Sequence, residues 1–210
     1  MKIKIFTLTG LSLLLFFAFS FAGWEKKPEF RWQQLYHYDL RQDNHQLYTN
    51  RLSLTFNYLD SQKKSLVKFI PFFEIRRNID NNFWQRKELG IEVGRDIFSW
   101  LYLGEAIQKG WMKEDYQYCQ FFEEKSYKES ETRLCLTHNL ISGKSIKLKG
   151  FAVNEYTYDF DKGAGVRNEL ALGLNMPVGK YVETELNWRH IDRIHFYDSD
   201  TLEASLTLIF

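Results

Sequence analysis

Alternation of apolar and polar residues over long segments is the feature that most constrains the fold of this chain. In residues 201–210, one face of a strand would carry Leu202, Ala204, Leu206, Leu208 and Phe210, and the other Thr201, Glu203, Ser205 and Thr207. Successive side chains of a β-strand point to opposite sides of the sheet, so a period of two indicates a strand with one apolar face. That pattern alone fits a half-buried strand of a soluble domain and a strand that faces lipid.

The same alternation recurs along the chain and predicts about ten antiparallel strands. We expect them at residues 29–41, 45–59, 64–78, 83–95, 97–110, 131–140, 145–160, 164–176, 181–191 and 201–210. Strands of soluble sheets usually have about 5–6 residues, whereas a tilted membrane strand needs about 9–11. Strand length therefore favours an all-β fold, a single antiparallel up-and-down transmembrane β-barrel of about ten strands.

Residues 1–22 have the features of a secretory signal peptide. Two lysines precede an apolar run over residues 5–19, and a small-x-small cleavage site ends at Ala22. The run is shorter than the ~20 apolar residues of a spanning helix, and no cysteine follows the site as a lipid anchor would require. We therefore predict a signal peptide at 1–22 and a β-barrel domain at 23–210. No second long apolar run follows, so a membrane location would require strands rather than helices.

The connections between the predicted strands differ in length at the two ends of the barrel. Short connections are expected near residues 60–63, 95–97, 141–144 and 177–180, and longer ones at 115–129 and 192–200. The charges at 123–129 are expected at the tip of the longest loop. Short turns at one end and longer loops at the other are typical of membrane barrels.

The polar faces of the predicted strands carry Arg and Glu in near balance. We predict that a charge network in the lumen includes Arg51, Glu74, Arg76, Glu88, Glu92, Glu131, Arg133, Glu155, Arg167, Glu169, Glu183, Glu185, Arg189 and Glu203. Charges tolerate burial only when they are paired, and Arg and Glu form bidentate pairs. The alternative is a solvated outer face on a soluble exported β-barrel.

Signal peptide, amphipathic strands and an aromatic residue at position 210 together resemble small bacterial outer-membrane β-barrel proteins. The spacing is also similar to an uncharacterised family of such barrels, a domain of unknown function. The resemblance implies the outer membrane of a Gram-negative-type envelope, with no established activity. It further implies that Phe210, Leu208 and Leu206 form an assembly signal, and that the partners are outer-membrane lipid, the barrel-assembly machinery and periplasmic chaperones.

The two cysteines, Cys119 and Cys135, would lie in an oxidising compartment. A disulfide needs Cα atoms within roughly 7 Å, which the sequence does not show, so their pairing stays open.

The sequence contains few groups arranged for chemistry. It has no phosphate loop, dinucleotide fingerprint or metal-ligand spacing, so we expect no cofactor, no metal site and no catalytic residue. The densest titratable cluster, at residues 189–200, includes His190 and His195 but has no matching Ser motif. Without the two lysines of the signal peptide, 26 basic residues remain against 27 acidic ones, which does not suggest nucleic acid as a partner.

The sequence is consistent with three functions, and it does not identify a ligand. The favoured one is a structural or interaction barrel with a charge-filled lumen. The alternatives are a narrow porin-like channel for small solutes and, less favoured, a lipid-modifying outer-membrane enzyme.

Overall fold

A computed structural model describes residues 23–25, 27–41, 46–62, 64–79, 84–113, 124–143, 147–193 and 198–210. Its strands are β1 (Gly23–Trp24), β2 (Glu29–Asp39), β3 (Gln46–Leu59), β4 (Ser65–Asn78), β5 (Trp84–Phe98), β6 (Leu101–Lys113), β7 (Glu124–Ser142), β8 (Lys147–Asp159), β9 (Ala164–Val178), β10 (Val182–Arg193) and β11 (Ser199–Ile209). Within these residues, no helix is long and apolar enough to cross a membrane. The predicted signal peptide lies outside the described residues.

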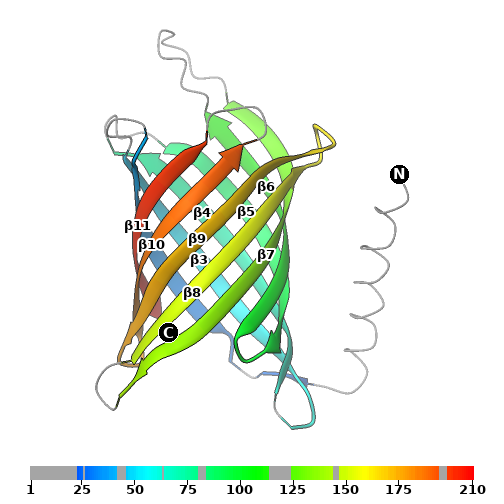
Figure 1. Cartoon of the computed structure of the whole chain (residues 1–210). Helices are drawn as coiled ribbons and strands as arrows, with labels where there is room; N and C mark the ends of the chain where they lie inside the picture. Colours follow the sequence, from blue (N-terminus) through cyan, green and yellow to red (C-terminus); the bar gives the residue numbers. More distant parts are fainter. Residues whose placement is uncertain are drawn as a thin grey trace.

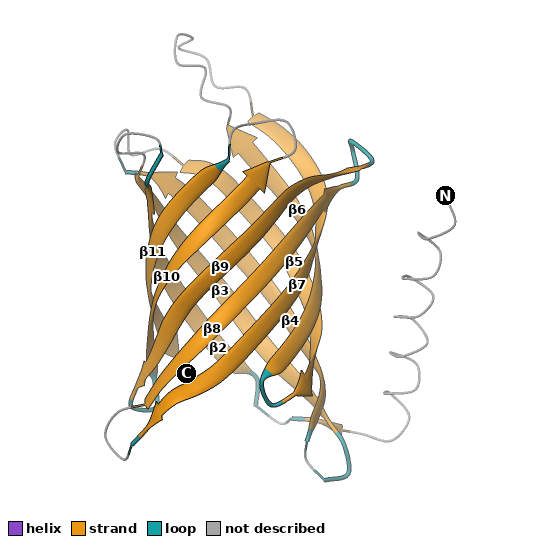
Figure 2. Ribbon diagram, in the orientation of Figure 1, coloured by secondary structure: helices purple, strands orange, loops and turns teal. Residues whose placement is uncertain are grey.

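The strands from β2 to β11 form a closed antiparallel barrel (Figures 1 and 2). Each pairs with the next strand in the sequence, and β11 pairs with β2 to close the barrel. Phe210 extends this seam, because its backbone exchanges hydrogen bonds of 2.9 and 3.2 Å with Phe30. The predicted all-β, up-and-down barrel is confirmed.

The short strand β1 is an addition to the predicted set. It pairs with the end of β3, in line with β2 along the same neighbour. Pro28 lies between β1 and β2, and its missing N–H interrupts the ladder. The Trp24 ring packs edge-on against Tyr58, with 5.1 Å between ring centroids, and Tyr58 is buried.

The predicted strand boundaries were wrong on both sides of the longest connection. β6 spans Leu101–Lys113 rather than 97–110, and β7 begins at Glu124, so most of the charged segment expected at a loop tip is strand. Glu129 in that segment pairs with Asp159 of β8 and is buried. Glu129 belongs to the inward face because the alternation through Glu131 and Arg133 continues back to it, whereas Lys128 points outward.

The short connections β3–β4, β5–β6, β7–β8 and β9–β10 lie at the end of the barrel that holds the C-terminus (Figure 1). The strands that flank residues 114–123 reach the opposite end, which we call the loop end. Gly163 and Gly179 follow β8 and β9 with φ of +65° and +72°, a backbone region that glycine adopts most easily.

The outer and inner faces invert the usual distribution of side chains. Ile107, Leu186 and Leu89 face outward with 63%, 59% and 57% of their surface exposed, whereas Glu203 and Glu92 face inward with 1% and 3% exposed. Large apolar residues are normally the buried ones. The barrel therefore has an apolar exterior and a charged interior.

Inward-facing aromatic rings cover glycines of neighbouring strands. The covered pairs are Phe72 on Gly90, Tyr102 on Gly94 and Tyr127 on Gly110. A Cβ atom at any of these glycines would collide with the ring, so the small residues make room for aromatic side chains inside the barrel.

Candidate functional site

The lumen is the candidate site, and it contains a cavity of about 740 Å³. Side chains from all ten barrel strands line it, because every second residue of each strand points inward. All fourteen residues predicted for the charge network are among them. Six of the fourteen are buried and the other eight are half-buried, so their contacts decide what the lumen can do.

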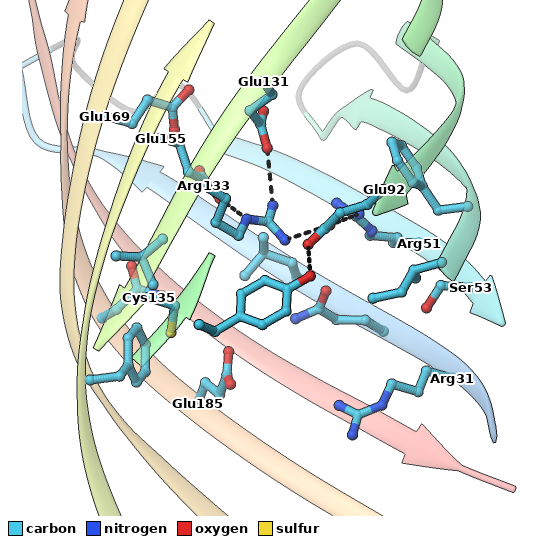
Figure 3. Close-up of a pocket in the computed structure, with 18 of the residues that line it drawn as sticks. Arg31, Arg51, Ser53, Glu92, Glu131, Arg133, Cys135, Glu155, Glu169 and Glu185 are labelled. Carbon is cyan, nitrogen blue, oxygen red and sulfur yellow. Dashed lines mark hydrogen bonds and ion pairs between the residues drawn. The ribbon is translucent and has the colours of Figure 1, made fainter. Parts of the chain in front are cut away.

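Arg133 on β7 is one centre of the network (Figure 3). Its guanidinium contacts Glu155 at 2.6 Å, Glu92 at 3.1 Å and Glu131 at 3.1 Å. The first of these residues lies on the adjacent strand β8, and Glu92 lies two strands away on β5. Tyr102 donates a hydrogen bond of 2.6 Å to Glu92 and thereby holds its carboxylate toward the lumen.

Arg189 on β10 is the second centre. Its guanidinium contacts Glu155 at 2.5 Å, Glu169 at 2.6 Å and Glu203 at 3.1 Å. Because Glu155 contacts both Arg133 and Arg189, the two centres are joined through one carboxylate. Arg167 also connects the two centres, because it lies 2.6 Å from Glu169 and 4.0 Å from Glu131.

The network continues around the rest of the wall through β11, β2 and β3. Glu203 contacts Nδ1 of His37 at 2.7 Å, and Nε2 of His37 lies 3.0 Å from the Thr49 hydroxyl. Two residues along β3 from Thr49, Arg51 contacts both Glu92 and Glu74 at 3.7 Å. Contacts thus pass from the Arg189 centre to Thr49 on β3, and Arg51 on the same strand contacts Glu92 of the Arg133 centre.

A second cluster, nearer the loop end, includes two residues that sequence reasoning missed. Arg86 pairs with Glu88, and it contacts Glu129 at 3.0 Å. Gln108 and Tyr127 donate hydrogen bonds of 3.0 and 2.9 Å to Glu88. Arg86 lies inside the predicted strand 83–95 with the inward parity of Glu88, and Glu129 lies two residues before the predicted strand 131–140 with the parity of Glu131, so parity alone could have found both.

Three predicted residues have contacts at the edges of the network. Arg76 approaches Glu74 at 3.5 Å, and Glu183 contacts the half-exposed Arg31 at 3.3 Å. Glu185 accepts a hydrogen bond of 2.9 Å from Asn175 and, within the described part of the chain, has no ion pair. In Figure 3, Arg31 and Glu185 lie apart from the contacts that surround Arg133.

The pairing explains how so many charges tolerate burial. Removing a charge from water costs several kcal/mol, which only a well-placed opposite charge offsets. Buried Glu155 has two guanidinium partners, and nearly inaccessible Glu203 has one guanidinium and His37. The pairing therefore accounts for the charged side chains inside the barrel.

The other predicted sites show no assembled chemistry. Within the described residues, no group of His, Cys, Asp and Glu could hold a metal ion. His190 lies 2.9 Å from Asp200, but among those residues it has no serine or cysteine partner. His195 and Cys119 lie outside the described residues, so the Cys119–Cys135 disulfide stays a prediction. Cys135 lines the lumen.

These features define a class: a closed ten-stranded antiparallel barrel with an ion-paired lumen and an apolar exterior. No family model and no curated protein matches the chain. The predicted assignment to a domain-of-unknown-function family therefore stays a prediction.

Solved structures similar to the chain are barrels. The β domain of the Bordetella autotransporter BrkA has 11% identity and a TM-score of 0.40, covering 87% of this chain and 98% of that one. The NanC porin has 9% identity and a TM-score of 0.39, and the match covers 86% of this chain and 98% of that one. The translocator domain of autotransporter NalP from Neisseria meningitidis has 9% identity and a TM-score of 0.32, and the match covers 99% of this chain and 96% of that one. Similarity at this level carries no argument about activity or ligand.

Proposed function

We propose that the chain is an integral outer-membrane β-barrel of a Gram-negative-type envelope, with a structural or interaction role and a lumen closed by its ion-pair network. The inverted side-chain distribution carries this proposal. An apolar surface that surrounds a soluble barrel would drive association, whereas lipid accepts it. Barrel strands of 11 to 19 residues exceed the about 9–11 that a tilted strand needs to cross the hydrocarbon.

Ion pairs between strands that are not neighbours in the sheet support closure of the lumen. Arg133 on β7 reaches Glu92 on β5, and Arg51 on β3 reaches the same carboxylate. A solute or hydrated ion passing this level would have to separate paired charges and leave some of them unpaired, which is costly in a partly desolvated lumen. A narrow channel is the second candidate, favoured by the cavity and its polar lining.

Assembly partners are part of the same proposal. Leu206 and Leu208 face outward on β11, and the rings of Phe210 and Phe30 pack at 5.8 Å beside the closing seam. We infer that Leu206, Leu208 and Phe210 are presented to the barrel-assembly machinery after delivery by periplasmic chaperones.

Membrane fractionation and heat-modifiable gel migration test the membrane assignment. We expect recovery in the outer-membrane fraction. We also expect the unheated barrel to migrate differently on the gel from the boiled chain. Recovery in the soluble fraction would favour the exported soluble barrel instead.

Planar-bilayer recording of the purified barrel tests closure. We expect no discrete openings from the wild-type protein. Arg189→Ala is the comparison variant, because it removes the side chain that joins three carboxylates. We expect this variant to conduct small ions. Discrete openings of the wild-type protein would replace the closed barrel with the channel.

A further inference from the structure

Cations on the outer wall are gathered on four consecutive strands. At the loop end, Arg77 on β4, Lys87 on β5, Lys109 on β6 and Lys128 on β7 point outward, alternating with inward residues such as Glu88 and Gln108. We call these four residues the basic patch. Within the described residues, the outward positions of the other six barrel strands contain no Lys or Arg. The outward Arg95 lies at the opposite end of β5.

The register of β6 and β7 sets two of these charges against each other. Lys109 lies directly opposite Lys128, and both side chains are exposed. Like charges directly opposite each other on a sheet destabilise it. Within the described part of the chain, no residue of the basic patch has a carboxylate partner. An anion from outside the chain would turn this repulsion into attraction.

The carboxylate of Glu105 lies near the basic patch on the outer face but has another partner. Glu105, on the same outer face, accepts a hydrogen bond of 2.6 Å from the Thr132 hydroxyl and lies four residues below Lys109. Lys113 is not counted in the basic patch, because its register partner is Glu124.

The basic patch borders the apolar exterior. On each of three strands the cation comes two residues beyond an outward apolar side chain: Ile75 before Arg77, Leu89 below Lys87, and Ile107 below Lys109. The change from apolar to charged therefore occurs at one level on neighbouring strands. A lipid that covers the apolar residues would bring its headgroup to the level of the cations.

Two tryptophans contact lysines of the basic patch. The ammonium of Lys87 lies 3.8 Å from the centroid of the Trp84 ring, and that of Lys109 lies 5.2 Å from Trp111. Trp84 is also in register with Arg77. Tryptophan is enriched at membrane interfaces, where its ring is apolar and its N–H meets headgroups. The contacts hold the lysine heads at the same level.

We propose that the basic patch binds the phosphate groups of an anionic lipid in the leaflet at the loop end. Lys and Arg are the usual phosphate-binding side chains, and Arg can do so with two parallel hydrogen bonds. A lipid fits better than a soluble phosphate because the apolar exterior begins two residues away and accommodates the acyl chains. This inference rests on the proposed membrane location of the barrel.

Unfolding in vesicles of defined composition tests the proposal. The wild-type barrel is refolded into phosphatidylcholine vesicles, with or without phosphatidylglycerol, and its urea unfolding midpoint is measured by tryptophan fluorescence. We expect phosphatidylglycerol to raise the midpoint of the wild-type protein. Each interfacial cation is worth about a fivefold change in the folding equilibrium, so the Lys109→Gln/Lys128→Gln variant should lose about 25-fold of that gain.

The sign of the effect in neutral lipid separates this proposal from a general loss of stability. In phosphatidylcholine alone, the double variant should be at least as stable as the wild-type barrel, because the opposed charges are gone. Lys162→Gln is the matched control, since Lys162 is an exposed cation at the loop end outside the basic patch. It should keep the full response to phosphatidylglycerol.

Three outcomes would overturn the proposal. They are an equal response of the wild-type and double-variant barrels to phosphatidylglycerol, loss of the response in Lys162→Gln, and a rise of equal size from inorganic phosphate in neutral vesicles. Failure of the wild-type chain to insert into any vesicle, seen as no heat-modifiable form, would instead refute the membrane location. Insertion without any dependence on lipid charge would refute only the basic patch.

Discussion

Replacing Arg133 with Met should destabilise the barrel strongly. The change keeps an unbranched side chain but removes a guanidinium that contacts three carboxylates within 3.1 Å. Removing one partner of a buried ion pair typically costs about 3–5 kcal/mol. Here Glu155 keeps Arg189 at 2.5 Å, and Glu92 keeps Arg51 at 3.7 Å. We therefore expect the lower end, about 3 kcal/mol.

Arg31→Met provides a matched control for this change. Arg31 also contacts two carboxylates, Glu29 at 2.5 Å and Glu183 at 3.3 Å, but these are 41% and 24% exposed, whereas the carboxylates that contact Arg133 are 4% to 14% exposed. Exposed ion pairs contribute about 0.2–1 kcal/mol. The same substitution should therefore cost several times less at position 31 than at position 133.

Urea unfolding of both variants in neutral vesicles measures the difference. The free energy of unfolding follows from the midpoint and slope of the tryptophan fluorescence transition. Equal costs for Arg133→Met and Arg31→Met would refute the reasoning, because they would mean that the lumen is hydrated enough to screen its charges. A variant of Arg133→Met that also carries Glu131→Gln should recover part of the loss, since it removes a carboxylate left with one distant partner.

Two further predictions concern packing and assembly. Gly94→Ala should lower the free energy of unfolding by about 1–3 kcal/mol, the usual cost of overpacking, because the new Cβ would collide with the Tyr102 ring. Tyr102→Ala should cost less stability in the Gly94→Ala variant than in the wild-type protein, because it removes the ring that collides. Phe210→Asp should reduce outer-membrane levels while leaving export intact, because it removes the ring contact with Phe30 at the seam; normal membrane levels by fractionation and blotting would contradict this role.

Much of the fold could be predicted from period-two alternation. Each inward face is specified locally, because a residue such as Arg51 or Glu203 has the same parity as its polar neighbours along one strand. A one-residue slip would turn charged residues to the apolar side, so parity also restricts the register. The same argument failed at 123–129, where strand residues, including the buried Glu129, looked like those of a solvated loop.

The sequence by itself determined the alternating strands, the apolar and charged faces and most of the charges in the lumen. Only the tertiary structure decided the pairing, because ion pairs such as Arg133–Glu92 join strands that are not neighbours in the sheet. It also decided that Lys109 meets Lys128, since register depends on both strands together. Local patterning specifies which side of a strand a residue takes, whereas barrel closure and shear decide which residue lies opposite.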